Sequence, residues 1–147
     1  MMETEFDRSR PLLLDTHTLV WTVNKSARLG DAISKVLDEA SLQDQLAVSA
    51  ITPWEIALLV SKGRLTLNAD VMEWLGEALA KPGVKLVGLE PEIAVASTRL
   101  PFEMHADPAD RILVATARHL GATLVTADRA LLGPATKGNF RAMDATA

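Results

Sequence analysis

The chain has 147 residues, of which 48% are hydrophobic, with 15 Lys and Arg, 19 Asp and Glu, three His and no Cys. A chain of this length buries about two thirds of its unfolded surface in one core, which predicts a single globular domain. The absence of cysteine excludes disulfide frameworks, thiolate zinc sites and cysteine nucleophiles, and it fits the reducing cytoplasm. A net charge of −4 argues against the basic surface of a non-catalytic nucleic-acid-binding protein.

No segment has the length of apolar sequence that a membrane requires. The longest apolar run, Ile56 to Val60, has five residues, whereas a membrane-spanning helix needs about 20. Residues 1–10 are polar and lack the apolar stretch of a secretory signal, so they are interpreted as a polar N-terminal tail. The remainder shows no repeat and no linker-like stretch, so residues 11–147 are predicted to form one domain.

Predicted strands and helices alternate along the chain. Short apolar runs predict strands at residues 12–14, 46–48, 84–89 and 123–126, with a fifth short strand near residues 139–143. Helical periodicity predicts helices at residues 30–40, 52–62, 70–80, 91–100 and 108–119. Strands that are apolar on both faces are typical of a mainly parallel sheet covered by helices on both sides. The expected fold class is therefore α/β, a three-layer α/β/α arrangement whose strand order the pattern does not determine.

Four acidic residues lie where this fold class places functional sites. Parallel strands end at one edge of the sheet, and ligands bind outside that carboxyl edge. Asp15 follows the first predicted strand and Asp128 follows the fourth. Glu55 lies in the first turn of the helix after the second strand, and Asp110 lies at the start of the helix that leads into the fourth. Because crossover helices run antiparallel to the strands, we expect all four carboxylates to converge.

Each acid also has a purely structural explanation. Thr52 and Glu55 fit a capping box, Asp107 fits a helix cap, and Asp15 and Asp128 can cap the helices that follow them. Four caps aimed at one edge by chance would leave like charges in mutual repulsion, so a bound cation explains the cluster better. Carboxylate oxygens select Mg²⁺ or Mn²⁺, whereas Zn²⁺ prefers His and Cys ligands, which are scarce in this chain.

The remaining polar and aromatic residues give weaker evidence about function than the four acids. No glycine-rich turn follows the first strand and no G-x-S-x-G occurs, so neither a nucleotide cofactor nor a serine triad is expected. His17 is interpreted as structural or exposed, and His105 either as a ligand paired with a nearby acid or as the donor of a turn-stabilising hydrogen bond. Three tryptophans fall at helical positions among apolar neighbours and are assigned to the core or to an interface rather than to base stacking, namely Trp21, Trp54 and Trp74.

Four short motifs occur in order over residues 12–128, nearly the whole chain. They are Leu-Leu-Leu-Asp15-Thr-His, Ser49-Ala-Ile-Thr-Pro-Trp-Glu55, Asp107-Pro-Ala-Asp110-Arg and Leu-Val-Thr126-Ala-Asp128. Together they resemble the motifs of PIN domains, in particular the VapC-type toxins of bacterial toxin–antitoxin systems. The resemblance implies a PIN-like α/β/α fold and a Mg²⁺- or Mn²⁺-dependent endoribonuclease acting on RNA. It also implies a homodimer and a cognate antitoxin protein whose tail enters the acidic groove.

The resemblance extends to individual residues. Five of them match the family's acids and its Ser or Thr two positions before the last acid, namely Asp15, Glu55, Asp110, Asp128 and Thr126. We predict that Asp15 and Asp110 bind the main metal ion and that Asp128 completes that site or a second one. Glu55 would orient or deprotonate the attacking water, and Thr126 would hold a carboxylate or a water in place. By family analogy, in-line attack would leave a 5′-phosphate and a 3′-hydroxyl.

One further residue and two alternative functions complete the expectations. Arg111 is the nearest cation in sequence to the acids, and we expect it to pair with a carboxylate or to hold a substrate phosphate. A haloacid-dehalogenase-like phosphatase would use Asp15 as nucleophile, although such enzymes carry a second acid two residues on, where this chain has His17. A catalytically silent PIN-like module would only bind a protein partner, and the intact set of acids argues against it.

Overall fold

The computed structural model describes residue 7 and residues 9–147, so most of the predicted tail, residues 1–6 and 8, lies outside the described residues. The elements in chain order are β1 (Leu12–Leu14), α1 (Thr16–Asn24), α2 (Asp31–Leu42), β2 (Leu46–Ser49), α3 (Ile51–Ser61), α4 (Val71–Leu79), β3 (Val84–Val87), α5 (Pro91–Ser97), α6 (Pro108–Leu120), β4 (Thr123–Thr126), α7 (Arg129–Ala135) and β5 (Arg141–Asp144). Across these described residues, no helix combines the length and apolar character needed to span a membrane.

The five strands form one parallel sheet in the order β3-β2-β1-β4-β5. β1 lies at the centre, with Leu13 opposite Ala47 of β2 and Leu124 of β4. All residues of these three strands are buried. The expected parallel sheet is confirmed. The strand order, which the sequence pattern does not determine, places the carboxyl ends of β2, β1 and β4 side by side.

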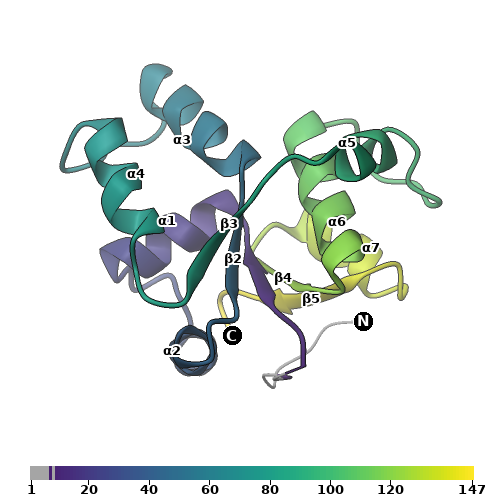
Figure 1. Ribbon diagram of the computed structural model, residues 1–147, viewed down its shortest axis with the longest axis horizontal. Helices are drawn as coiled ribbons and strands as arrows, with labels where there is room; N and C mark the ends of the chain where they lie inside the picture. Colours follow the sequence, from purple (N-terminus) through teal and green to yellow (C-terminus); the bar gives the residue numbers. More distant parts are fainter. Residues whose placement is uncertain (1–6, 8) are drawn as a thin grey trace.

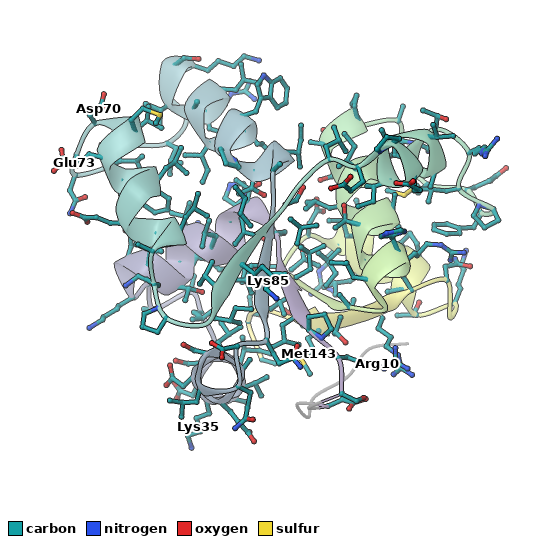
Figure 2. All side chains as sticks on the ribbon, in the orientation of Figure 1. Arg10, Lys35, Asp70, Glu73, Lys85 and Met143 are labelled. Atoms are coloured by element: carbon teal, nitrogen blue, oxygen red, sulfur yellow. The ribbon has the colours of Figure 1, made fainter. Side chains whose placement is uncertain are left out.

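Helices cover both faces of this sheet, as Figure 1 shows. Successive residues of β1 face opposite sides, so Leu12 and Leu14 pack in one core cluster with residues of α1, α2 and α4, whereas Leu13 packs in a second cluster with α6 and α7. The predicted three-layer α/β/α arrangement is therefore confirmed. Charged side chains such as Lys35 of α2 and Glu73 of α4 project away from these layers (Figure 2).

Most predicted elements are present, with small shifts at their ends. β3 ends at Val87 and α5 at Ser97, before the predicted ends at residues 89 and 100. The fifth strand spans Arg141–Asp144, slightly later than predicted. Short helices, α1 and α7, follow Asp15 and Asp128 directly, and each acid is the N-cap of its helix.

The predicted capping box at the start of α3 is wrong. The helix begins at Ile51, whose N–H donates to the hydroxyl of Ser49 at 3.1 Å. Thr52 is fully buried instead, and its hydroxyl has no hydrogen-bond partner among the described residues. Because the helix begins one residue earlier than predicted, Glu55 lies in its second turn. Its carboxylate is therefore not needed as an acceptor for the unpaired N–H groups of the first turn.

Candidate active site

A cavity of about 380 Å³ opens at the carboxyl edge of the sheet. Its wall contains all four acids that the sequence singled out, so the structure brings them together from β1, β4 and the starts of two helices. The residues that line it are Asp15, Thr16, His17, Trp21, Glu55, Asp107, Asp110, Leu113, Ala127 and Asp128. Thr126 and Arg111, which were also predicted for the site, do not line the cavity.

Asp15 is held from two sides at the end of β1. Its Oδ1 accepts a hydrogen bond from the N–H of Thr18 at 2.8 Å, which caps α1, and its Oδ2 accepts one from the hydroxyl of Thr126. The side chain is buried, with 7% of the residue exposed. Burial raises the pKa of the Asp15 carboxyl, and the hydrogen bonds from Thr126 and Thr18 oppose that rise. Asp15 is thus both a helix cap and part of the cavity wall.

Thr126 connects Asp15 to the last of the four acids. Besides donating to Asp15, its hydroxyl accepts the N–H of Asp128 at 3.0 Å. Asp128 in turn caps α7, because its Oδ1 accepts the N–H of Ala130 at 2.9 Å. Thr126 therefore holds a carboxylate in place from behind the cavity, which is the contact that the sequence analysis predicted for it.

Glu55 reaches the cavity from α3. Its Oε1 accepts a hydrogen bond from the hydroxyl of Thr16, a buried residue that follows Asp15 directly. The pKa of Glu55 is raised, first by burial and then by the negative charges of Asp110, Asp107 and Asp15. The sequence analysis did not identify Thr16, since only the fold brings α3 next to the start of α1.

Asp110 pairs with a histidine that the sequence analysis left open. Nε2 of His105 lies 2.7 Å from Oδ2 of Asp110, within hydrogen-bond distance. The pKa of Asp110 is raised by burial and then by the charges of Asp107 and Asp128, and the hydrogen bond from His105 opposes the rise. Asp107 accepts the N–H of Asp110 at 3.1 Å, so its predicted role as a helix cap is confirmed. The sequence signal for His105 was its short spacing before the acids of α6.

The expected pairing of Arg111 with a carboxylate is wrong, whereas its alternative role of holding a substrate phosphate stays a prediction. Its Nε donates to the carbonyl of Ser97 at 2.9 Å and its guanidinium also reaches the carbonyl of Met104 at 3.4 Å, so it pairs with main-chain oxygens rather than with a carboxylate. Successive residues of a helix point about 100° apart. Arg111 therefore leaves the face that carries Asp110 and joins α6 to the end of α5 and to the segment that follows it.

The charges of the cavity fit a divalent cation. Among the described residues, five carboxylates and one histidine line it, and no Lys or Arg does. The pKa values of Asp15, Glu55 and Asp110 are raised, first by burial in all three and then, for Glu55 and Asp110, by neighbouring carboxylates. Within the described part of the chain, no group of three or more His, Asp or Glu side chains is placed so that it could hold a metal ion as it stands. Carboxylate oxygens are the ligands that Mg²⁺ selects, so the fit rests on the charge and chemistry of the lining alone.

Known proteins resemble this chain in sequence and in fold. The sequence profile of the PIN domain family matches residues 12–135. The chain is 40% identical over 120 residues to Ribonuclease VapC22 of Mycobacterium tuberculosis (strain ATCC 25618 / H37Rv), covering 82% of this chain and 88% of that protein.

Solved structures share the architecture at lower identity. One is VapBC2 from Rickettsia felis bound to a DNA fragment from their promoter, with a TM-score of 0.63, 17% identity and 97% of both chains covered. Another is a toxin–antitoxin complex from Klebsiella pneumoniae, with a TM-score of 0.54, 24% identity and coverage of 80% of this chain and 86% of that chain. At these identities the likenesses show a common fold.

Proposed function

The chain belongs to the PIN domain family, and on that basis we propose that it is a Mg²⁺- or Mn²⁺-dependent endoribonuclease and the toxin of a toxin–antitoxin pair. One observation carries the catalytic part of this proposal. Asp15, Glu55, Asp110 and Asp128 line a single cavity, and none of the other described residues in its wall is Lys or Arg. A phosphodiester carries negative oxygens, so such a cavity can accept it only when a cation is present.

The substrate and the biological role rest on the relatives. The protein that is 40% identical over most of this chain is a ribonuclease, which supports RNA as the substrate. The shared fold with a toxin–antitoxin complex supports a cognate antitoxin as partner. By the same family analogy we propose a homodimer, and a bacterial RNA substrate would place the activity in the cytoplasm.

The chain's own residues have distinct tasks in this proposal. Asp15 and Asp110 would hold the cation, with Asp128 completing that site or a second one. When bound, the cation supplies positive charge to the scissile phosphate and lowers the pKa of a water molecule. Thr126 keeps the Asp15 carboxylate in a fixed orientation through the hydrogen bond from its hydroxyl.

Glu55 handles the proton of the attacking water. Its Oε1 is oriented by the hydroxyl of Thr16, and we assign the proton transfer to Oε2. Attack by water in line with the leaving oxygen yields a 5′-phosphate and a 3′-hydroxyl. Asp107 caps α6 with its carboxylate, and we assign it no catalytic task.

Cleavage of a labelled RNA by the purified full chain tests this proposal. Wild-type protein should cleave in Mg²⁺ or Mn²⁺ and stop in EDTA. Asp15→Asn and Asp110→Asn should abolish cleavage while retaining a cooperative melt, and Asp31→Asn, a change at an exposed acid of α2, should cleave like wild type. Undiminished cleavage by both site variants would contradict the assignment. Calorimetry that detects no Mg²⁺ or Mn²⁺ binding, together with no cleavage, would favour a module that only binds a protein.

A further inference from the structure

One wall of the acidic cavity is aromatic. His17 and Trp21 of α1 both line it, with ring centroids 6.4 Å apart and ring planes tilted by 55°. The two residues are four positions apart, so they share one face of the helix. Asp15 caps this same helix, which places the aromatic face directly beside the carboxylates.

Trp21 is not simply a core residue. It is partly buried and packs against the core cluster, yet it also contributes to the cavity wall. After α1 the chain turns back at Lys25, which has a positive φ of 52°, and the N–H of Ser26 donates to the carbonyl of Trp21 at 2.9 Å. This turn brings the guanidinium of Arg28 to 6.0 Å from the indole centroid. Trp21 lines the cavity and Arg28, which lies over its ring, does not.

The chemistry of the remaining wall explains what this surface can bind. The carboxylates, with a cation, can bind the phosphodiester group of an RNA. The ribose and the base attached to that phosphodiester need a different surface of the cavity. Apart from the aromatic wall, only Leu113 and Ala127 offer apolar surface. An indole ring provides a π-face on which any base can stack, and such stacking is common to proteins that bind single strands. A base in a duplex is already stacked and paired, so it cannot use this surface.

We propose that Trp21 is the base-stacking residue of this site, with His17 beside it and Arg28 against the indole. The site then takes an unpaired nucleotide next to the phosphodiester that is cleaved. This inference rests on the proposed ribonuclease function. It also revises the assignment of Trp21 to the core or an interface.

The other two tryptophans supply controls. Trp74 is 3% exposed and its Nε1 lies 3.4 Å from Oδ1 of Asn24, so its assignment to the core is confirmed. Trp54 of α3 is 56% exposed and does not line the cavity. Trp54→Leu is therefore a matched control for Trp21→Leu, since it makes the same chemical change outside the proposed subsite.

The subsite is tested by the binding of a fluorescein-labelled single-stranded RNA of about ten nucleotides, measured by fluorescence anisotropy in Mg²⁺. All proteins in this assay carry Glu55→Gln, so that the RNA stays intact. Trp21→Leu should weaken binding by about 5- to 150-fold, the range that corresponds to about 1–3 kcal/mol of base–aromatic stacking. Trp21→Phe should recover most of the affinity, and Trp54→Leu should bind like the parent. The same RNA annealed to its complement should bind weakly and show no dependence on Trp21.

A second measurement leaves Trp21 unchanged and so does not depend on how its variants fold. In Trp54→Phe protein, unlabelled single-stranded RNA should quench the emission of Trp21, whereas the duplex should not, and buried Trp74 contributes a constant background. Absence of quenching, or equal affinity of Trp21→Leu and Trp54→Leu for the single strand, would overturn the subsite.

Cleavage by the otherwise unmodified chain separates the two proposals. If wild type cleaves the RNA and Trp21→Leu cleaves it with the same KM, the stacking subsite is wrong and the ribonuclease function stands. If wild type neither binds nor cleaves RNA in Mg²⁺, the proposed function is wrong and the subsite falls with it. A raised KM in Trp21→Leu, with little change in Trp54→Leu, supports both.

Discussion

The hydroxyl of Thr126 joins two acids of the candidate active site, and its removal tests how much this link contributes to stability. Thr126 is fully buried, donates to Oδ2 of Asp15 and accepts the N–H of Asp128 at 3.0 Å. Thr126→Val removes both interactions with little change in shape, whereas Thr126→Ser retains the hydroxyl. The two variants therefore differ mainly in the hydrogen bonds under test.

The structure sets the expected size of the effect. A hydrogen bond to a charged acceptor contributes about 1.5–3 kcal/mol, and the bond from the Asp128 N–H contributes about 0.5–1.5 kcal/mol. The added methyl group of valine returns about 0.8 kcal/mol through apolar burial. Thr126→Val should therefore lower the free energy of unfolding by about 1–4 kcal/mol, with a midpoint of about 2.5 kcal/mol. At that midpoint, the melting temperature of a domain of this size should fall by about 5–10 °C.

Thermal melts followed by circular dichroism in EDTA measure this effect. Thr126→Ser keeps the hydroxyl and loses one buried methyl group, so it should melt only about 2–3 °C below wild type. Thr116→Val is a second control, because Thr116 is also buried but its hydroxyl donates only to the carbonyl of Ile112 in its own helix, at 2.7 Å. A Thr126→Val protein that melts together with Thr126→Ser would refute the reasoning, since the link to the two acids would then contribute nothing.

Three further outcomes are expected. Thr52→Val should raise the melting temperature by about 2–6 °C, because a buried hydroxyl without a partner costs about 1–2 kcal/mol, and an unchanged melt would contradict this. The metal-free protein should lose stability as the pH rises above about 4, since the raised pKa values of Asp15, Glu55 and Asp110 mean that the folded chain binds more protons than the unfolded chain. Urea titrations measure this loss of unfolding free energy at each pH. Glu55→Gln should reduce the loss by less than about 1 kcal/mol, because Glu55 is partly exposed. An equal reduction in Glu73→Gln, at an exposed acid of α4, would refute the origin of the loss in the cavity. Mg²⁺ at about 100 times its Kd should stabilise wild type by about 2.7 kcal/mol and Asp110→Asn by much less. Equal stabilisation of both proteins would argue against a cation at Asp110.

The fold was predictable because its signals are local. The apolar run at residues 12–14 becomes the central strand, and the periodic segment at residues 108–119 becomes α6 with nearly the predicted ends. Strand order was not predictable, because pairing of Leu13 with Leu124 depends on contacts between segments far apart in the chain. The start of α3 was predicted wrongly, since the hydroxyl of Ser49 accepts the first N–H and Thr52 turns into the core.

In the candidate site too, some residues were predictable from the sequence and others were not. The acids were found because an acidic residue after a buried parallel strand has a known location, the carboxyl edge. The side chains that orient them were harder to find. Thr16 contacts Glu55 only because α3 packs near the start of α1, and His105 reaches Asp110 from a segment without regular structure. The direction of Arg111 was predictable in principle, because its position one residue after Asp110 turns it to another face of α6.

The structural and functional explanations of the acids are compatible because one geometry produces both. Asp15, Asp107 and Asp128 cap α1, α6 and α7, so each carboxylate lies at the positive end of a helix. Those helix ends offset part of the repulsion between neighbouring carboxylates and help to keep the cluster assembled without a cation. The offset is incomplete, since burial and mutual repulsion still raise the pKa of Asp110 and of Glu55, which caps no helix. In the proposed function a divalent cation would relieve this remaining repulsion, while the caps hold the carboxylates in place without it.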